Sequence, residues 1–92
     1  MPELTPDQIK AALPSVKEWK KSAATVSRTF QFKDFVAAMD FVTKVAALAE
    51  AANHHPDIDI RWNKVTLHLT THSAGGLTEN DFNLAQQIDR LL

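Results

Sequence analysis

The sequence predicts an α+β fold in which helices cover one face of a four-stranded antiparallel sheet. Three observations predict it. A helix pattern opens the chain, a long apolar helix pattern lies in its middle, and a third helix pattern closes it. Two short strand patterns occupy each gap between these helices. The order is therefore α-β-β-α-β-β-α, which is typical of an antiparallel sheet with its helices on one side. We expect residues 1–92 to form a single domain.

The first helix is predicted from its boundary residues. Thr5 suits an N-cap and Pro6 suits the first helical position. The helix is expected to run from Thr5 to about Leu13, because Pro14 stops it.

The next two elements are predicted to be strands. One begins at Trp19, and the other runs from Val26 to Phe32 with alternate side chains on one face. The residues of that face are Val26, Arg28, Phe30 and Phe32.

The long helix is predicted from Phe35 to about Ala52, and two apolar stripes run along it. One consists of Phe35, Met39, Val42, Ala46 and Ala49, and the other of Ala38, Phe41, Val45 and Leu48. A surface helix in a monomer normally has one wet face. We therefore expect one stripe to pack on the sheet and the other to lie partly at a subunit interface. The alternative is a wide, alanine-rich face that is half exposed.

The second pair of strands follows Pro56, which ends the long helix. Apolar and polar residues alternate from 58 to 62 and again from 65 to 70, the pattern of half-buried strands. Asn63-Lys64 is the predicted turn between them.

The last helix is predicted to begin with a capping box at Thr78 and Asp81, after the break at Gly75-Gly76. The residues expected on its inner face are Phe82, Ala85, Ile88 and Leu92.

Composition narrows the classes of function. The formal net charge is −1, which gives no electrostatic signature of nucleic-acid or anionic-membrane binding. The absence of cysteine excludes disulfides, thiolate metal sites and cysteine nucleophiles. The first residues lack the positive flank and apolar run of a secretory signal, and the most apolar stretch, from Phe35 to Ala52, is interrupted by charged residues. A cytoplasmic protein without a membrane segment is expected.

The candidate chemistry lies in the histidines. All 4 fall between residues 54 and 72. His54 and His55 sit where the long helix meets a strand, and the following hairpin returns His72 to the same level. We expect these three imidazoles to converge near the start of the last helix, where they can supply a proton donor and a proton acceptor. His68 alternates with Thr66 and Thr70 and is expected on the polar sheet face.

Other interpretations of these residues remain open. Three imidazoles with a carboxylate from Glu50, Asp57 or Asp81 could bind zinc, although no familiar ligand spacing occurs. Asp81 has an alternative explanation as well, because an acid in the first turn of a helix stabilises the helix N-terminus without any catalytic role. Glu50 lies four residues before His54 and can either orient that imidazole or simply solubilise the helix end.

The spaced residues resemble the signature of the pterin-4a-carbinolamine dehydratase family. They are Glu50, His54-His55-Pro56, Trp62, His72 and Asp81. The segments from Arg28 to Phe35 and from Thr71 to Ala85 also resemble that family, so the likeness covers nearly the whole chain.

The resemblance implies dehydration of a 4a-hydroxytetrahydropterin to a quinonoid dihydropterin during tetrahydropterin recycling, with no cofactor or metal. It implies that His54 and His72 act as acid and base, in an order left open, and that His55 chiefly binds and orients the pterin. The other residues that it implies at the substrate site are Glu50, Pro56, Thr71 and Asp81.

The family likeness also implies homodimers joined at sheet edges and tetramers joined through the long helices. The alternatives to a dehydratase are a non-catalytic binding or coactivator module, a relative acting in molybdopterin metabolism, and a metal-dependent hydrolase.

Overall fold

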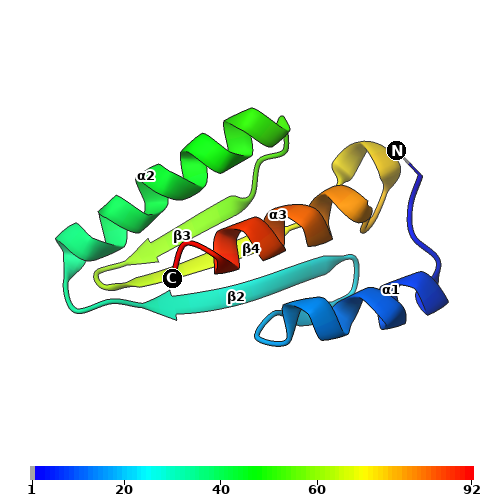
Figure 1. Cartoon of the computed structure of the whole chain (residues 1–92), viewed down its shortest axis with the longest axis horizontal. Coiled ribbons are helices and arrows are strands. Elements are labelled where there is room, and N and C mark those ends of the chain that lie inside the picture. Colours follow the sequence, from blue (N-terminus) through cyan, green and yellow to red (C-terminus); the bar gives the residue numbers. More distant parts are fainter. Residues whose placement is uncertain (1) are drawn as a thin grey trace.

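Residues 2–92 are described by a computed structural model, in which one four-stranded antiparallel sheet carries all the helices on one face (Figure 1). This confirms the predicted fold class and the order of its elements. The elements are α1 (Pro6–Ala12), the 3-10 turn η1 (Leu13–Val16), β1 (Lys20–Ser22), β2 (Thr25–Gln31), α2 (Phe35–Ala52), β3 (Asp57–Arg61), β4 (Lys64–Leu69), the 3-10 turn η2 (His72–Ala74) and α3 (Glu79–Asp89).

The strands lie in the order β1-β2-β4-β3, so β1 and β3 form the two edges of the sheet. All neighbours are antiparallel, with Val26 opposite Leu69 and Ile58 opposite Leu67. Alternation sends one set of side chains toward the helices, where they form a continuous core with α2 and α3. Its fully buried members include Val26, Val45, Val65, Leu67, Leu69, Leu84, Ala85 and Ile88.

The opposite face of the sheet is polar and carries no helix (Figure 1). The hydroxyls of Thr29 and Thr66 pair across β2 and β4 at 2.8 Å. His68 lies on this face between Ser27 and Asp57, its neighbours across the ladder. The prediction that His68 belongs to the polar face is therefore confirmed.

α2 has the predicted bounds, because both ends are capped. The side chain of Asp34 accepts a hydrogen bond from the backbone of Ala37, and Asn53 closes the other end in a left-handed conformation with φ 50°. One stripe is buried and consists of Ala38, Phe41, Val45 and Ala49, so Ala49 belongs to it and not to the Phe35 stripe expected from the sequence. Phe35, Val36 and Ala46 are exposed in the single chain, so part of the second apolar surface has no partner within it.

Three expectations at element ends were wrong. Trp19 precedes β1 and is buried in the core, 4% exposed. The hairpin turn is Trp62-Asn63 rather than Asn63-Lys64, because the Asn63 side chain donates to the Phe32 carbonyl and ties the turn to the end of β2. Leu92 is 64% exposed because α3 ends at Asp89.

α3 is fixed to β2 by a polar contact at its C-terminal end. One carboxylate oxygen of Asp89 accepts from the Trp19 indole and from the Arg28 guanidinium, each at 2.8 Å. Together with the core, this contact holds α3 so that its start lies beside the end of α2 (Figure 1). Within residues 2–92, no helix is long and apolar enough to cross a membrane.

Candidate active site

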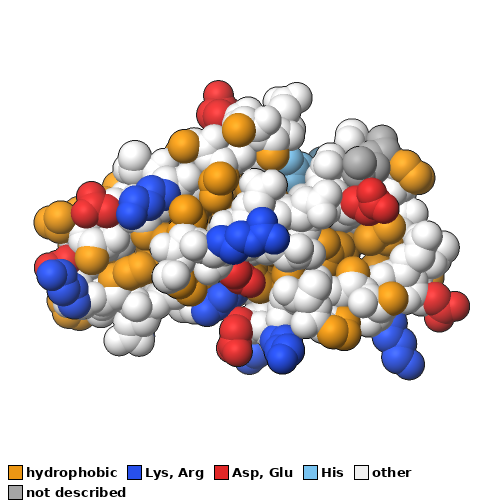
Figure 2. All heavy atoms as spheres, viewed as in Figure 1, with side chains coloured by type: hydrophobic (Ala, Val, Ile, Leu, Met, Phe, Trp, Pro, Cys, Tyr) orange, Lys and Arg blue, Asp and Glu red, His pale blue; other side chains and the backbone are white. Residues whose placement is uncertain are grey.

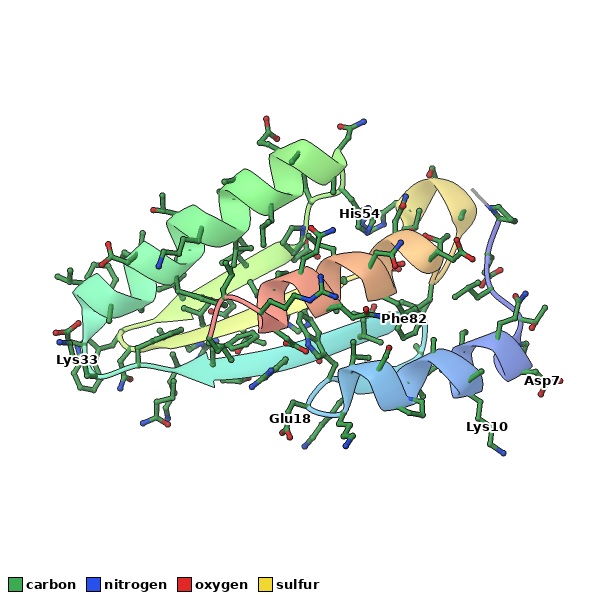
Figure 3. All side chains as sticks on the ribbon, viewed as in Figure 1. Asp7, Lys10, Glu18, Lys33, His54 and Phe82 are labelled. Carbon is green, nitrogen blue, oxygen red and sulfur yellow. The ribbon has the colours of Figure 1, made fainter. Side chains whose placement is uncertain are left out.

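His54 and Asp81 form a buried pair where the end of α2 meets the start of α3. Nε2 of His54 lies 2.5 Å from Oδ1 of Asp81, and these residues are 9% and 0% exposed. Figure 3 shows His54 reaching from the loop after α2 toward the first turn of α3. Asp81 is therefore placed to orient this imidazole.

The backbone after α2 explains why His54 turns inward. Asn53 adopts the left-handed conformation that asparagine tolerates better than most residues, and the His54 N–H still bonds to the Ala49 carbonyl at 3.0 Å. Pro56 then favours an extended backbone for the residue before it. Thus His54 is directed into the protein while His55 is exposed.

Asp81 is held by the N-terminal capping of α3. Its Oδ2 accepts from the Thr78 backbone N–H at 2.9 Å and from the Thr71 hydroxyl at 2.8 Å. The predicted capping box at Thr78 and Asp81 is present. Because the same carboxylate also contacts His54, capping its helix and orienting a histidine are compatible roles for Asp81.

Thr78 belongs to this cluster, although the sequence suggested only a capping role for it. Its hydroxyl lies 2.8 Å from that of Thr71, and both residues are buried. The capping-box pattern was visible in the sequence. What it could not show is that Thr71, which comes from the end of the preceding strand, bonds to the same carboxylate.

His55 and Glu50 form a second pair, which is solvent-exposed. Nε2 of His55 contacts Oε2 of Glu50 at the C-terminal end of α2. The interpretation that Glu50 orients His54 is wrong for this structure, because the left-handed Asn53 ends the helical spacing that would have joined them. Glu50 instead positions the imidazole of His55.

His72 is exposed and begins η2, directly after the buried Thr71. Within residues 2–92 its ring has no hydrogen-bond partner, so no polar contact joins it to His54 or His55. Thr71 pairs with Gly76 and closes the loop that carries His72. The structure thus joins His54, Thr71 and Asp81 by hydrogen bonds and places His72 on the adjoining loop, and it shows no polar contact among the three imidazoles that were expected to converge.

The described part of the chain offers no set of ligands for the zinc site considered from the sequence. No group of three or more His, Asp or Glu side chains in residues 2–92 is arranged to hold a metal ion. The contacts described above are pairwise, His54 with Asp81 and His55 with Glu50.

The surface around the pairs is open rather than enclosed. Figure 2 shows histidine side chains in a hollow between the end of α2 and the segment that precedes α3. The larger concavities lie elsewhere, along α1, and are lined by residues such as Leu4, Ile9 and Gln86. Those concavities contain none of the histidines, so the candidate site is identified by its histidine–carboxylate pairs rather than by the size of a cavity.

The chain is similar to known proteins over nearly its whole length. Residues 2–91 match the family described as pterin 4 alpha carbinolamine dehydratase. A protein from Acidobacterium capsulatum, provisionally named a pterin-4-alpha-carbinolamine dehydratase, is 58% identical over 92 residues and covers all of both chains. A protein from Roseiflexus sp. with the same provisional name is 53% identical over 89 residues, covering 97% of this chain and 96% of its own.

Solved structures give the same result. The crystal structure of a transcriptional coactivator/pterin dehydratase from Brucella melitensis has a TM-score of 0.92 and 34% identity, with 97% of each chain covered. A pterin dehydratase-like protein identified as a RuBisCO assembly factor of the alpha-carboxysome has a TM-score of 0.65 at 23% identity, with 79% of this chain and 84% of its own covered. That second likeness concerns the fold alone. The full-length match of sequence and structure shows that this chain belongs to the pterin-4a-carbinolamine dehydratase family.

Proposed function

We propose that this protein dehydrates a 4a-hydroxytetrahydropterin to a quinonoid dihydropterin by histidine acid–base catalysis, in tetrahydropterin recycling. The observation that carries the proposal is the buried His54–Asp81 pair, whose side chains lie 2.5 Å apart where the end of α2 meets the start of α3. An imidazole oriented by a carboxylate is a common arrangement for moving protons near neutral pH. The family membership supplies the substrate class.

The reaction needs two proton transfers and no net oxidation. A base removes the proton from N5, the C4a–N5 double bond forms, and an acid protonates the departing hydroxyl, so that water leaves. One histidine gains a proton while the other loses one, and exchange with solvent restores both. His54 and His72 take these two roles, and general acid–base catalysis supplies about 10²–10⁴-fold in rate. The chemistry requires neither cofactor nor metal.

The remaining site residues bind and position. His55, which contacts Glu50, is exposed and is available to contact the pterin. Pro56 fixes the backbone after the two histidines. The Thr71 hydroxyl donates to Asp81, and Asp81 contacts His54, which favours a positioning role for both.

The exposed apolar part of α2 supports assembly of several copies. Phe35 is 48% and Val36 67% exposed, and β1 and β3 leave two free sheet edges. Contiguous apolar surface of this kind usually marks an interaction site. We expect a homodimer or homotetramer formed through the α2 surface and the sheet edges, in the cytoplasm.

The activity is tested by stopped-flow absorbance on freshly generated 4a-hydroxytetrahydropterin, measured with and without a chelator. The wild-type protein is expected to accelerate water loss above the spontaneous rate, and His72→Ala is expected to lose most of that acceleration. Activity that disappears with the chelator would indicate the metal-dependent alternative. A wild-type rate equal to the spontaneous rate would leave a non-catalytic binding module, as the coactivator name of the Brucella melitensis relative suggests.

A further inference from the structure

We infer that Thr78 and Thr71 fix the protonation of His54 through Asp81. They hold Asp81 as an acceptor, so that Nε2 of His54 keeps its proton and Nδ1 is the nitrogen that exchanges a proton with the substrate. The substrate part of this inference rests on the proposed function, whereas the protonation of the ring does not.

The hydroxyl hydrogens in the cluster can be assigned from the bonds themselves. Thr71 has one hydroxyl hydrogen, which it donates to Oδ2 of Asp81 at 2.8 Å. Thr78 must then be the donor in the 2.8 Å contact between the two hydroxyls. The oxygen of Thr78 in turn accepts from the Asn80 N–H at 3.2 Å. The bonds therefore run in one direction, from the start of α3 through Thr78 and Thr71 to Asp81.

These donors are directed at one carboxylate oxygen of Asp81. Oδ2 already accepts two hydrogen bonds, from the Thr71 hydroxyl and the Thr78 backbone, and the N-terminus of α3 adds its positive dipole. An ionised carboxyl group can only accept hydrogen bonds. The hydrogen in the contact between Oδ1 and Nε2 must therefore belong to His54.

The other ring nitrogen is left for exchange. A neutral imidazole carries one N–H, so a proton on Nε2 makes Nδ1 an acceptor. Nδ1 has no hydrogen-bond partner within residues 2–92. It is also not sealed from solvent, because that part of the chain has no buried side-chain nitrogen or oxygen without a partner. A proton that arrives at Nδ1 creates an imidazolium, which Asp81 stabilises without taking a proton itself.

The test is the tautomer of His54, measured by ¹H–¹⁵N correlation spectra of the labelled protein at a pH where the ring is neutral. The wild-type ring is expected to show its bound proton on Nε2. In Asp81→Asn the amide oxygen must take the place of Oδ2, because Thr71 and the Thr78 N–H still donate there. The amide NH₂ then faces Nε2, so the ring proton is expected to move to Nδ1.

Thr71→Val and Thr66→Val form a matched pair of isosteric changes, since each removes one hydroxyl from a Thr–Thr contact of 2.8 Å. Thr71→Val is expected to raise the fraction of the Nδ1–H tautomer and to lower kcat about tenfold with KM unchanged, the scale of one hydrogen bond to a charged group. Thr71→Ser is expected to restore both quantities. Thr66→Val, on the open sheet face, should change neither.

A wild-type ring protonated at Nδ1 would overturn the inference, as would an Asp81→Asn ring still protonated at Nε2. The wild-type spectrum decides even if a variant fails to fold. Failure of the proposed function can be told apart, because a wild-type protein without dehydratase activity would still have a measurable His54 tautomer in its spectrum.

Discussion

His54 and Asp81 are 27 residues apart in the sequence, yet their side chains meet at 2.5 Å and are almost completely buried. One comes from the loop after α2 and the other from the first turn of α3. The contact therefore joins two segments that no hydrophobic pattern would bring into register. It makes the stability of α3 depend on the same carboxylate that orients the histidine.

Asp81→Ala is expected to lower the free energy of unfolding by about 3 kcal/mol, because it leaves the Thr78 N–H and the Thr71 hydroxyl without their acceptor in a buried site. Urea unfolding followed by circular dichroism measures this loss. Asp40→Ala removes an exposed carboxylate from α2 and is expected to change stability by less than about 0.5 kcal/mol. Equal effects of the two changes would contradict a structural role for Asp81.

Ala23 and Ala24 form the turn between β1 and β2 and make a second matched pair. Ala23 has φ 52°, a left-handed conformation that costs an ordinary residue about 1–2 kcal/mol. Ala23→Gly is therefore expected to raise the free energy of unfolding, by up to about 1 kcal/mol. Ala24 has no positive φ, so Ala24→Gly is expected to lower stability by roughly 0.5–1 kcal/mol through the entropy of the unfolded chain. Thermal unfolding of both variants would reveal effects of opposite sign, and a loss in both would refute the strain at Ala23.

The exposed apolar part of α2 gives a prediction about assembly. Ala46→Glu places a charge on the exposed apolar stripe that also contains Phe35 and Met39, and it is expected to dissociate the proposed oligomer. Glutamate is a good helix former at an exposed position, so the monomer should remain folded. Ala51→Glu makes the same exchange at an exposed position seven residues after Lys44, on the charged side of the helix, and is the control. Sedimentation velocity measures the masses, and an unchanged mass in Ala46→Glu would place the interface elsewhere.

Most of the fold followed from local rules. Thr5 and Thr78 begin their helices as N-caps, α1 ends before Pro14 and α2 before Pro56, and alternation in β4 identified Val65, Leu67 and Leu69 as core. These features depend on residues near one another in the sequence, so the sequence pattern was sufficient to predict them.

The predictions that failed concern contacts between segments that are distant in the sequence. The turn lies one residue earlier than predicted, because Asn63 bonds to Phe32. Glu50 contacts His55 rather than His54, because Asn53 adopts a left-handed conformation. Likewise, the Thr78 hydroxyl belongs to the site because it lies within hydrogen-bond distance of the Thr71 hydroxyl. No periodicity within a single element records such a meeting.

The central claim is that a buried, carboxylate-oriented histidine dehydrates the pterin substrate. The most direct measurement compares kcat for wild type, His54→Ala and His68→Ala by stopped-flow absorbance, after circular dichroism has shown all three to be folded. His54→Ala is expected to lose about 10²–10⁴-fold in kcat, the scale of general acid–base catalysis. His68→Ala removes the same group from the open face of the sheet and should retain the wild-type rate. Full activity in His54→Ala, or an equal loss in both variants, would contradict the account.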